Sequence, residues 1–355
     1  MPPAIDGNVG VTMQLRYLLH APALAAPSTL APRAVVAGRV SAGPGLVMRD
    51  HATLRADGEA VRVGSNGFFG VRATVHIADS LFLAIIGDDV SVGRYGLVHA
   101  CTLGDGVAVA DAATVMDGAV VGDHALLMPG AVVPPRKALA GGIVYAGSPA
   151  VALRAIAREE LALWHAALRA EHSLQPAPRT DLPAPEAALS THPPCGARSA
   201  TSFVAATARI AGQVELADDA SLYFACVADA GDARIALGAR SNVQDNTFLA
   251  ASRARGDLLI GDDVTVGHNV RMGSGTVGHR ALIGMAAIVG DGVIVEDGAC
   301  IGAGAHVEPG TRVPSGWIYA GRPARPFREL KPAEREGFAD IVAVYAHYSE
   351  AYRTA

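Results

Sequence analysis

The stretch LGDGVAVADAATVMDGAVVGDHALLMPGAVV, residues 103–133, carries an aliphatic side chain at every sixth position. An α-helix would repeat its apolar residues near every 3.6 positions and a half-buried strand near every second, so neither element alone produces this period. Short strands joined by tight turns do produce it, when each strand points one aliphatic side chain into a shared core. Gly104 and Gly122 directly follow two of the repeated positions and suit such turns. The repeated positions in this stretch are Leu103, Val109, Val115, Val121, Leu127 and Val133.

The same ladder of aliphatic residues occurs again in the C-terminal half of the chain. Ile86 and Ile260 are 174 residues apart, and so are Val133 and Val307. Both ladders contain a single step of five residues, at equivalent places. The chain is therefore predicted to hold two diverged copies of one domain, in register from about residues 61 and 235 to residues 150 and 324.

The ends of the two copies divide the chain into four parts. The ladders end alike, at YAGSPA and YAGRPA, and a helix-like segment follows each of them, over residues 152–170 and about 333–352. The intervening segment is rich in Pro, Ala and Thr, which is typical of a linker. We expect an N-terminal segment at 1–29, copy 1 with a capping helix at 30–172, a Pro/Ala-rich linker at 173–202, and copy 2 with a capping helix at 203–355.

The composition excludes several classes of protein. Half of the 355 residues are hydrophobic but only 5% are aromatic, and the 40 glycines suit many tight turns around a narrow aliphatic core. A net charge of −5 argues against a nucleic-acid partner, and no apolar stretch is long enough to predict a membrane-spanning helix. The segment at 15–26 has no basic leader, so we expect no signal peptide. Four scattered cysteines without a CxxC pattern predict reduced thiols and a cytoplasmic protein; they are Cys101, Cys195, Cys226 and Cys300.

Three short segments resemble the γ-class carbonic anhydrases and their relatives, a family of hexapeptide-repeat proteins. They are IGDDVTVGH at 260–268, GARSNVQD at 238–245 and LRAD at 54–57. The resemblance spans nearly all of 30–170 and 203–352. It implies a mainly β fold of two left-handed parallel β-helix domains, each with a C-terminal α-helix and with three hexapeptides to one triangular turn.

The resemblance also implies a zinc site shared between two neighbouring β-helices. In the family one β-helix supplies an early and a late histidine, and its neighbour supplies a third in a Val-Gly-His motif. Arginine, alanine and glycine side chains offer no lone pair to a metal. One such residue in copy 1 and two in copy 2 mean that neither copy alone offers three ligands. The three positions read His76, His99 and Arg94 in copy 1, and Ala250, Gly273 and His268 in copy 2.

The losses in the two copies are complementary. Copy 1 placed against copy 2 in one orientation rebuilds the set His76, His99 and His268, whereas the reverse orientation offers no histidine. The resemblance thus implies one composite site that binds zinc, with iron and cobalt as alternative metals. The copy 1–copy 2 interface could form within one chain or across a homo-oligomer, as a dimer or a trimer.

Other family positions follow the same division between the copies. The family's Arg-x-Asp residues are Arg55 and Asp57 in copy 1, whereas its Asn-x-Gln-Asp residues are Asn242, Gln244 and Asp245 in copy 2. By resemblance, these five are candidate catalytic residues. Arg55 would pair with Asp245 across the interface, and Gln244 would hydrogen-bond the zinc-bound water or a substrate.

Aromatic residues replace polar family residues at one place in copy 1. They are Phe68 and Phe69, and we expect them either to line the zinc pocket or to pack against copy 2.

The implied chemistry is that of an open zinc site. Three imidazoles leave a coordination position for water, whose pKa zinc lowers towards about 7. We therefore expect a zinc-dependent lyase or hydrolase in which zinc hydroxide attacks CO2 or a small carbonyl-type metabolite. Gly58 replaces a glutamate linked to proton transfer in the reference enzyme, so the small-molecule substrate stays open. The alternatives are a non-catalytic β-helix scaffold, or a hexapeptide-repeat acyltransferase, for which neither a long catalytic loop nor a basic CoA site is evident.

Overall fold

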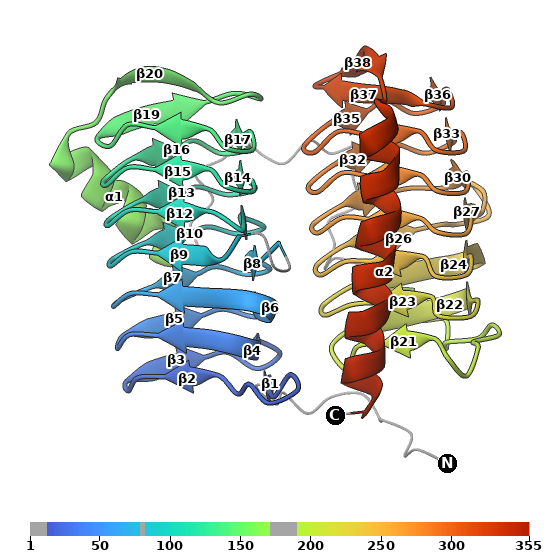
Figure 1. Ribbon diagram of the computed structural model, residues 1–355, viewed down its shortest axis with the longest axis horizontal. Coiled ribbons are helices and arrows are strands. Elements are labelled where there is room, and N and C mark those ends of the chain that lie inside the picture. Colours follow the sequence, from blue (N-terminus) through green and yellow to red (C-terminus); the bar gives the residue numbers. More distant parts are fainter. Residues whose placement is uncertain (1–12, 79–81, 171–189, 355) are drawn as a thin grey trace.

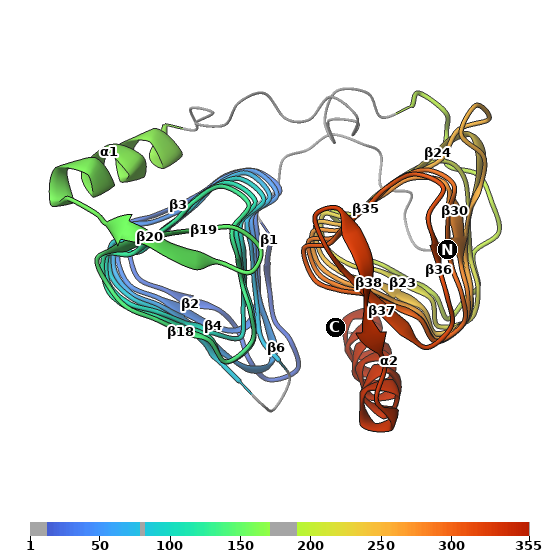
Figure 2. The same ribbon diagram turned by 90° about the horizontal axis from the view of Figure 1, so that it is seen from above.

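The protein is described by a computed structural model covering residues 13–78, 82–170 and 190–354. The chain forms two β-solenoids that stand side by side with their coils stacked in the same direction (Figure 1). Seen from above, each solenoid is a three-sided coil (Figure 2). Most of the predicted linker, at 171–189, and residues 1–12 of the predicted N-terminal segment lie outside the described residues.

The described part of copy 1 contains sheets of twelve and eight strands, in which all pairings are parallel except the last one along the chain. Strands β1 to β3 pair in parallel with β4 and β5, so part of the N-terminal segment joins the solenoid. The strands are β1 (Met13–Leu15), β2 (Ala23–Leu24), β3 (Ser28–Leu30), β4 (Val35–Ala42), β5 (Leu46–Met48), β6 (Thr53–Val63), β7 (Phe68–Phe69), β8 (Thr74–His76), β9 (Ala84–Ile86), β10 (Ser91–Val92), β11 (Leu97–His99), β12 (Thr102–Leu103), β13 (Ala108–Val109), β14 (Thr114–Val115), β15 (Val120–Val121), β16 (Leu126–Leu127), β17 (Val132–Val133), β18 (Ala138–Leu139), β19 (Ile143–Ala146) and β20 (Val151–Ala155).

Copy 2 repeats this arrangement with sheets of ten and eight strands. Its last pair, β37 and β38, is antiparallel and closes the top of the solenoid, as β19 and β20 do in copy 1. The strands are β21 (Phe203–Val204), β22 (Arg209–Leu216), β23 (Ser221–Leu222), β24 (Val227–Leu237), β25 (Asn242–Val243), β26 (Phe248–Ala250), β27 (Leu258–Ile260), β28 (Thr265–Val266), β29 (Arg271–Met272), β30 (Gly275–Val277), β31 (Leu282–Ile283), β32 (Ile288–Val289), β33 (Val293–Val295), β34 (Cys300–Ile301), β35 (His306–Val307), β36 (Arg312–Val313), β37 (Trp317–Gly321) and β38 (Ala324–Glu329).

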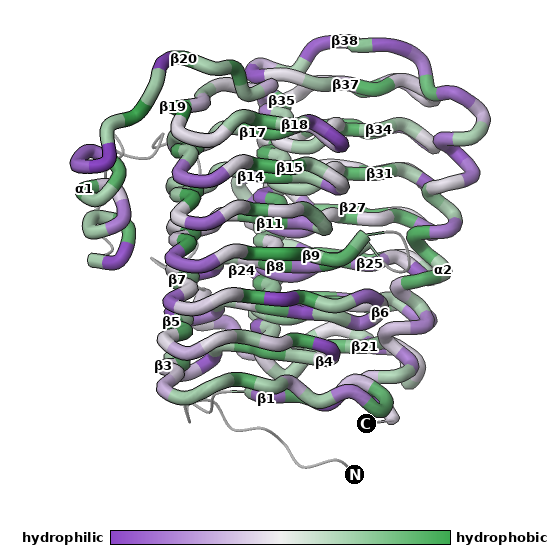
Figure 3. The backbone as a smooth tube through the Cα atoms, turned by 60° about the vertical axis from the view of Figure 1, so that its left-hand side comes forward, coloured by the Kyte–Doolittle hydropathy of each residue, from purple (hydrophilic) through white to green (hydrophobic). Residues whose placement is uncertain are grey.

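The six-residue ladder forms the core of each solenoid. Val109, Leu127 and Val133 are completely buried in copy 1, and Val307 is completely buried in copy 2. Many hydrophilic residues lie at the corners between strands (Figure 3). The predicted mainly β fold of two solenoid domains, each followed by a helix, is confirmed.

The two terminal helices differ in length and surroundings. Helix α1 (Arg158–Arg169) begins later than the predicted residue 152, because Val151–Ala155 instead pair with β19. It packs on β10 and β13. Helix α2 (Pro332–Thr354) packs on β21, β25 and β28, and it extends eleven residues beyond the position equivalent to the end of α1. These extra residues amount to about three turns of helix. No described helix is both long and apolar enough to span a membrane.

The buried ladder generates a stability prediction. Leu127→Ala removes a completely buried side chain, and should lower the free energy of unfolding by about 2–5 kcal/mol, because the surrounding coils cannot close the cavity. Leu153→Ala, on the exposed strand β20, is the matched control and should change it by less than about 0.5 kcal/mol. Urea denaturation followed by circular dichroism measures both. Equal effects of the two substitutions would contradict the assignment of the ladder to the core.

Candidate metal centre

Two of the three histidines project from neighbouring coils of copy 1. His76 ends β8 and His99 ends β11, and the parallel register of these strands pairs the two residues directly. The imidazole nitrogens His76 Nδ1 and His99 Nε2 are 3.2 Å apart. Both side chains are buried, so the coil geometry alone brings two potential ligands together.

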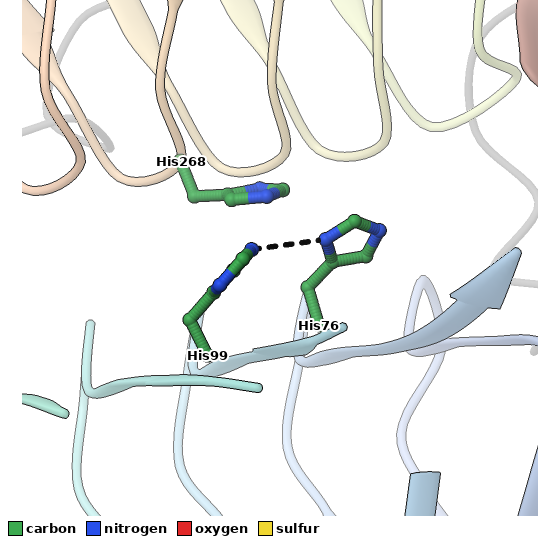
Figure 4. Close-up of side chains that lie close together, drawn as sticks. All are labelled: His76, His99 and His268. Carbon is green, nitrogen blue, oxygen red and sulfur yellow. Dashed lines mark hydrogen bonds between the residues drawn. The ribbon is translucent and has the colours of Figure 1, made fainter. Parts of the chain in front are cut away.

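The third histidine comes from the other solenoid. His268 follows β28 at a corner of copy 2, and its ring centroid lies 4.7 Å from that of His76 and 5.3 Å from that of His99. One nitrogen of each ring can be chosen so that all three lie within 4.8 Å of one another. Figure 4 shows the rings converging from opposite sides of the interface. The cluster therefore forms within one chain, which is one of the two arrangements left open by the sequence.

The cluster has the features that a zinc ion needs. His268 Nδ1 is buried and makes no hydrogen bond among the described residues, although Asp245 Oδ2 lies 3.3 Å away. A buried ring nitrogen without a hydrogen bond costs free energy unless something else satisfies it. Zinc–nitrogen bonds of about 2.05 Å in a tetrahedron place two ligand nitrogens about 3.3 Å apart. The 3.2 Å between His76 and His99 matches that separation. These residues fit a zinc ion, and a set of three imidazoles suits one.

Burial keeps the imidazoles in the form that binds metals. It lowers the pKa of His76 well below its ordinary value, and the positive Arg55 adds to the effect. Burial likewise lowers the pKa of His268 to about 4, although Asp245 opposes the shift. Both rings are therefore neutral at pH 7 and carry a free lone pair.

A carboxylate that the sequence analysis did not identify orients His99. His99 Nδ1 donates a hydrogen bond of 2.5 Å to Asp117 Oδ1, which leaves Nε2 directed at the cluster. Burial disfavours the charged form of Asp117, but His99 outweighs burial and the pKa of Asp117 is lowered. One triangular turn of three hexapeptides is 18 residues, and Asp117 follows His99 by 18. This coil-to-coil offset could have revealed the contact.

A buried ion-pair network lies beside the cluster. Arg55 Nε donates to Asp245 Oδ2 over 2.8 Å, and Arg55 Nη1 also donates to Asp57. The side chains of all three residues are completely buried. Asp245 Oδ2 also lies 3.3 Å from His268 Nδ1. Burial opposes the charge on Arg55, but Asp245 outweighs burial and the pKa of Arg55 is raised. The ion pair between Arg55 and Asp245 joins copy 1 to copy 2, as the motif resemblance implies.

Known proteins similar to this chain agree with the geometry. No family model matches the sequence. Gamma carbonic anhydrase 1, mitochondrial, of Arabidopsis thaliana is 34% identical over 147 residues, which are 40% of this chain and 54% of that protein. Gamma carbonic anhydrase 3, mitochondrial, of the same plant is 43% identical over 136 residues, 37% of this chain and 53% of that protein. The chain belongs to the γ-carbonic anhydrase-like hexapeptide-repeat β-helix proteins.

The matches to these curated relatives span about half of each relative's length. A solved structure of a hexapeptide transferase family protein from Anaplasma phagocytophilum is 33% identical to the chain, with a TM-score of 0.43. The alignment covers 44% of the chain and 92% of that protein.

In this γ-carbonic anhydrase-like chain, the extra turns of α2 cover the cluster with tyrosines. Tyr345 Oη hydrogen-bonds to His268 Nε2 over 3.1 Å and accepts a hydrogen bond of 3.4 Å from Arg55 Nη2. Tyr352 donates its hydroxyl to Asp57. The guanidinium of Arg55 also lies over the rings of Tyr345 and Tyr348. Spacings of three, four and seven residues place these tyrosines on one helix face, a pattern that the sequence analysis did not use.

The side-chain amides of copy 2 hydrogen-bond to one another and to copy 1. Gln244 Nε2 donates to Asn242 Oδ1 over 3.2 Å, and Asn242 Nδ2 donates to Thr265 Oγ1. Asn246 and Asn269, which sequence reasoning missed, hydrogen-bond to Thr74 Oγ1 of copy 1 at 2.9 and 2.7 Å. Both asparagines sit at solenoid corners with positive φ angles, which asparagine tolerates well. That preference is the signal that could have marked them.

Two expectations for the aromatic residues of copy 1 were wrong. Phe68 lies within 5.7 Å of the guanidinium carbons of Arg49 and Arg169, the latter on α1, so it packs near that helix rather than in the metal centre or against copy 2. Phe69 belongs to the internal core of copy 1. The strand β7 that carries both residues lies in the eight-stranded sheet, whereas His76 and His99 project from the twelve-stranded sheet.

The buried network predicts a large cost for removing its cation. Arg55→Ala leaves Asp57 and Asp245 buried without their guanidinium, and should lower the free energy of unfolding by about 3–5 kcal/mol. Arg240→Ala is the matched control, because Arg240 pairs with Asp263 on the surface; its cost should stay below about 1 kcal/mol. Chemical denaturation of the metal-free chain measures both values. A loss at Arg55 no larger than the loss at Arg240 would show that the network does not hold the copies together.

Proposed function

We propose that the chain is a zinc enzyme of the γ-carbonic anhydrase type that adds water to CO2 or to a comparably small carbonyl-type metabolite. The observation that supports this most is the meeting of His76, His99 and His268 from two diverged copies. Neither copy could supply the set alone, so the fused chain retains the combination of residues that the proposed chemistry needs.

His76, His99 and His268 would hold the zinc. A zinc ion bound by three imidazoles supplies a Lewis acid that lowers the pKa of water towards about 7 and makes a nucleophile available at neutral pH. Asp117 fixes the ring of His99 through Nδ1, so that Nε2 remains the donor atom facing the cluster. Tyr345 contacts His268 Nε2 over 3.1 Å and Asp245 lies 3.3 Å from His268 Nδ1, so neighbours on both sides restrict the orientation of this ring.

Tyr345 is proposed to position the substrate by donating a hydrogen bond. Burial raises the pKa of its hydroxyl above the ordinary value, so the group keeps its proton at neutral pH. Arg55 Nη2 donates to the Tyr345 oxygen, and the same oxygen lies 3.1 Å from His268 Nε2. The hydroxyl proton is available to a substrate when His268 Nε2–H is the donor of that second contact. A substrate oxygen beside His268 could accept that proton in a hydrogen bond.

The remaining candidate residues are proposed to shape the site. Arg55, Asp57 and Asp245 would hold the two copies in register, and Asn242 and Gln244 would present amides towards the substrate. His268 is 0% and His99 is 8% exposed, so little of the cluster is open to solvent. This favours a substrate of a few atoms. A cytoplasmic location is proposed from the scattered cysteines of the sequence.

Removal of the copy 2 ligand tests the proposed function. His268→Ala should lose stoichiometric zinc and, with it, the acceleration of CO2 hydration, because two imidazoles remain where an open zinc site has three. His279→Ala removes a half-exposed histidine of copy 2 and is the control. Metal analysis and stopped-flow CO2 hydration measure the two properties.

Three results would each redirect the proposal. A wild-type chain without stoichiometric metal would favour the scaffold alternative. Zinc-loaded protein that does not hydrate CO2 would restrict the proposal to small carbonyl-type substrates. Metal retained in His268→Ala would overturn the composite site.

The orienting carboxylate gives a second, graded test. Asp117→Asn keeps the shape of the side chain but weakens its hydrogen bond with His99, and should lower zinc affinity by about 10- to 100-fold. Asp291→Asn, the equivalent change in copy 2, should leave it unchanged because Gly273 replaces the histidine there. Competition with a chromogenic chelator measures the affinity. Similar losses in both variants would rule out a specific role for Asp117.

A further inference from the structure

Copy 2 retains the outline of a half-site in which the two histidine ligands have been lost. Ala250 and Gly273 occupy the positions of His76 and His99, and a pocket of about 60 Å³ lies beside them. The pocket lies on the strands β26, β29, β32 and β35, which correspond to β8, β11, β14 and β17 of copy 1. Its lining also includes Arg255, Arg271 and Asp291.

The charge of this pocket is opposite to that of the copy 1 half-site. In copy 1 the pair of imidazoles has the carboxylate of Asp117 beside it, a set that suits a cation. In copy 2 the carboxylate is kept as Asp291, but Arg271 stands at the position of Leu97. Arg255 adds a second guanidinium. Two guanidinium groups against one carboxylate suit an anion.

Arg271 is the cation that most needs a counter-ion. Its guanidinium carbon lies 4.4 Å from the centroid of the Tyr95 ring of copy 1. Among the described residues it forms no ion pair. A guanidinium remains charged at neutral pH, and burial, which is only partly opposed by Tyr95, lowers the pKa of Arg271. A partly buried charge without a carboxylate partner is costly, so a bound anion would stabilise this arrangement.

The remaining contacts in the pocket involve Asp291 and Arg255. Asp291 Oδ1 accepts hydrogen bonds from Ser274 N at 3.0 Å and from Ser274 Oγ at 3.2 Å. A Cβ atom added to Gly273 would collide with that carboxylate oxygen, so Asp291 occupies room that a side chain at 273 would need. Arg255 Nη1 stays 4.0 Å from Asp291, and Arg255 Nε donates to Ser252 Oγ. The lost ligand position at 273 is thus closed to histidine without rearrangement.

We propose that this pocket binds a small oxyanion, with Arg271 and Arg255 as its cationic ligands. A single water needs about 10–15 Å³ of such space, so 60 Å³ admits an anion of about four or five heavy atoms. Guanidinium groups bind the oxygens of phosphate and carboxylate-like anions through paired N–H donors. Bicarbonate and inorganic phosphate share this chemistry. The proposal does not depend on the zinc chemistry, because neither the ligand histidines nor the metal belongs to the pocket.

Calorimetric titration of the full chain, stripped of metal by a chelator, tests the pocket. Inorganic phosphate and bicarbonate are titrated separately in a low-chloride buffer at neutral pH. At least one should bind saturably with one site per chain. Arg271→Leu, which installs the residue found in copy 1, should weaken binding by about 10- to 100-fold, since charged hydrogen bonds are lost. Arg253→Leu is the control, because Arg253 is highly exposed and should leave the affinity unchanged.

A second variant protects the test against misfolding. Arg255 lies on the turn that follows β26 and its side chain is 34% exposed, so Arg255→Leu should fold normally, as circular dichroism would verify, and should weaken binding in the same direction. His268→Ala should bind the anion as the wild type does. The proposal is overturned if neither anion binds saturably, if Arg255→Leu binds as tightly as the wild type, or if His268→Ala abolishes binding.

Discussion

The arrangement of the whole molecule depends on one buried charge. Arg55 is completely enclosed, and a buried guanidinium costs several kcal/mol unless oppositely charged groups surround it. Asp57 comes from its own copy, but Asp245 comes from the other, at 2.8 Å. Tyr223 of copy 2 also lies 4.8 Å from the guanidinium. Copy 1 can therefore bury Arg55 favourably only when copy 2 lies against it in the observed orientation. The same orientation places His268 beside His76 and His99.

Duplication within one chain explains why the two copies could diverge so far. When identical β-helices assemble, every copy must carry both halves of an interfacial site. Once two copies are joined in one chain and meet in one orientation, each copy needs to keep only its own half of the site. Copy 2 has no histidine at 250 or 273, and copy 1 has no histidine at 94. The end of α2 has diverged in the same way, since Tyr345, Tyr348 and Tyr352 have no counterpart on the shorter α1.

The solenoid core and the three histidines were predictable because a coil of fixed length converts position in sequence into position in space. The six-residue ladder predicted the core, and the offset of 174 made the complementary losses visible. The same logic could have placed Asp117 beside His99. Packing of α2 was not predictable, because the repeat does not determine where a helix lies outside the coils. Phe68 was misplaced for a related reason: motif comparison gave its equivalent in copy 2, but not which face of copy 1 meets the other copy.

The corners of the solenoids show how the interface favours unlike copies. Arg72 Nη1 donates to Asn246 Oδ1 at 3.2 Å, and Asn269 Nδ2 donates to the Tyr95 carbonyl oxygen at 3.0 Å. The members of each pair are 174 residues apart, so equivalent corners of the two copies meet. Two copies of type 1 meeting in this way would bring two Arg72 guanidinium groups together, and like charges in a buried contact are unfavourable. Asn246 instead offers an acceptor for Arg72. The contacts between corners thus favour the pairing of copy 1 with copy 2, and this pairing is the one that forms the metal centre.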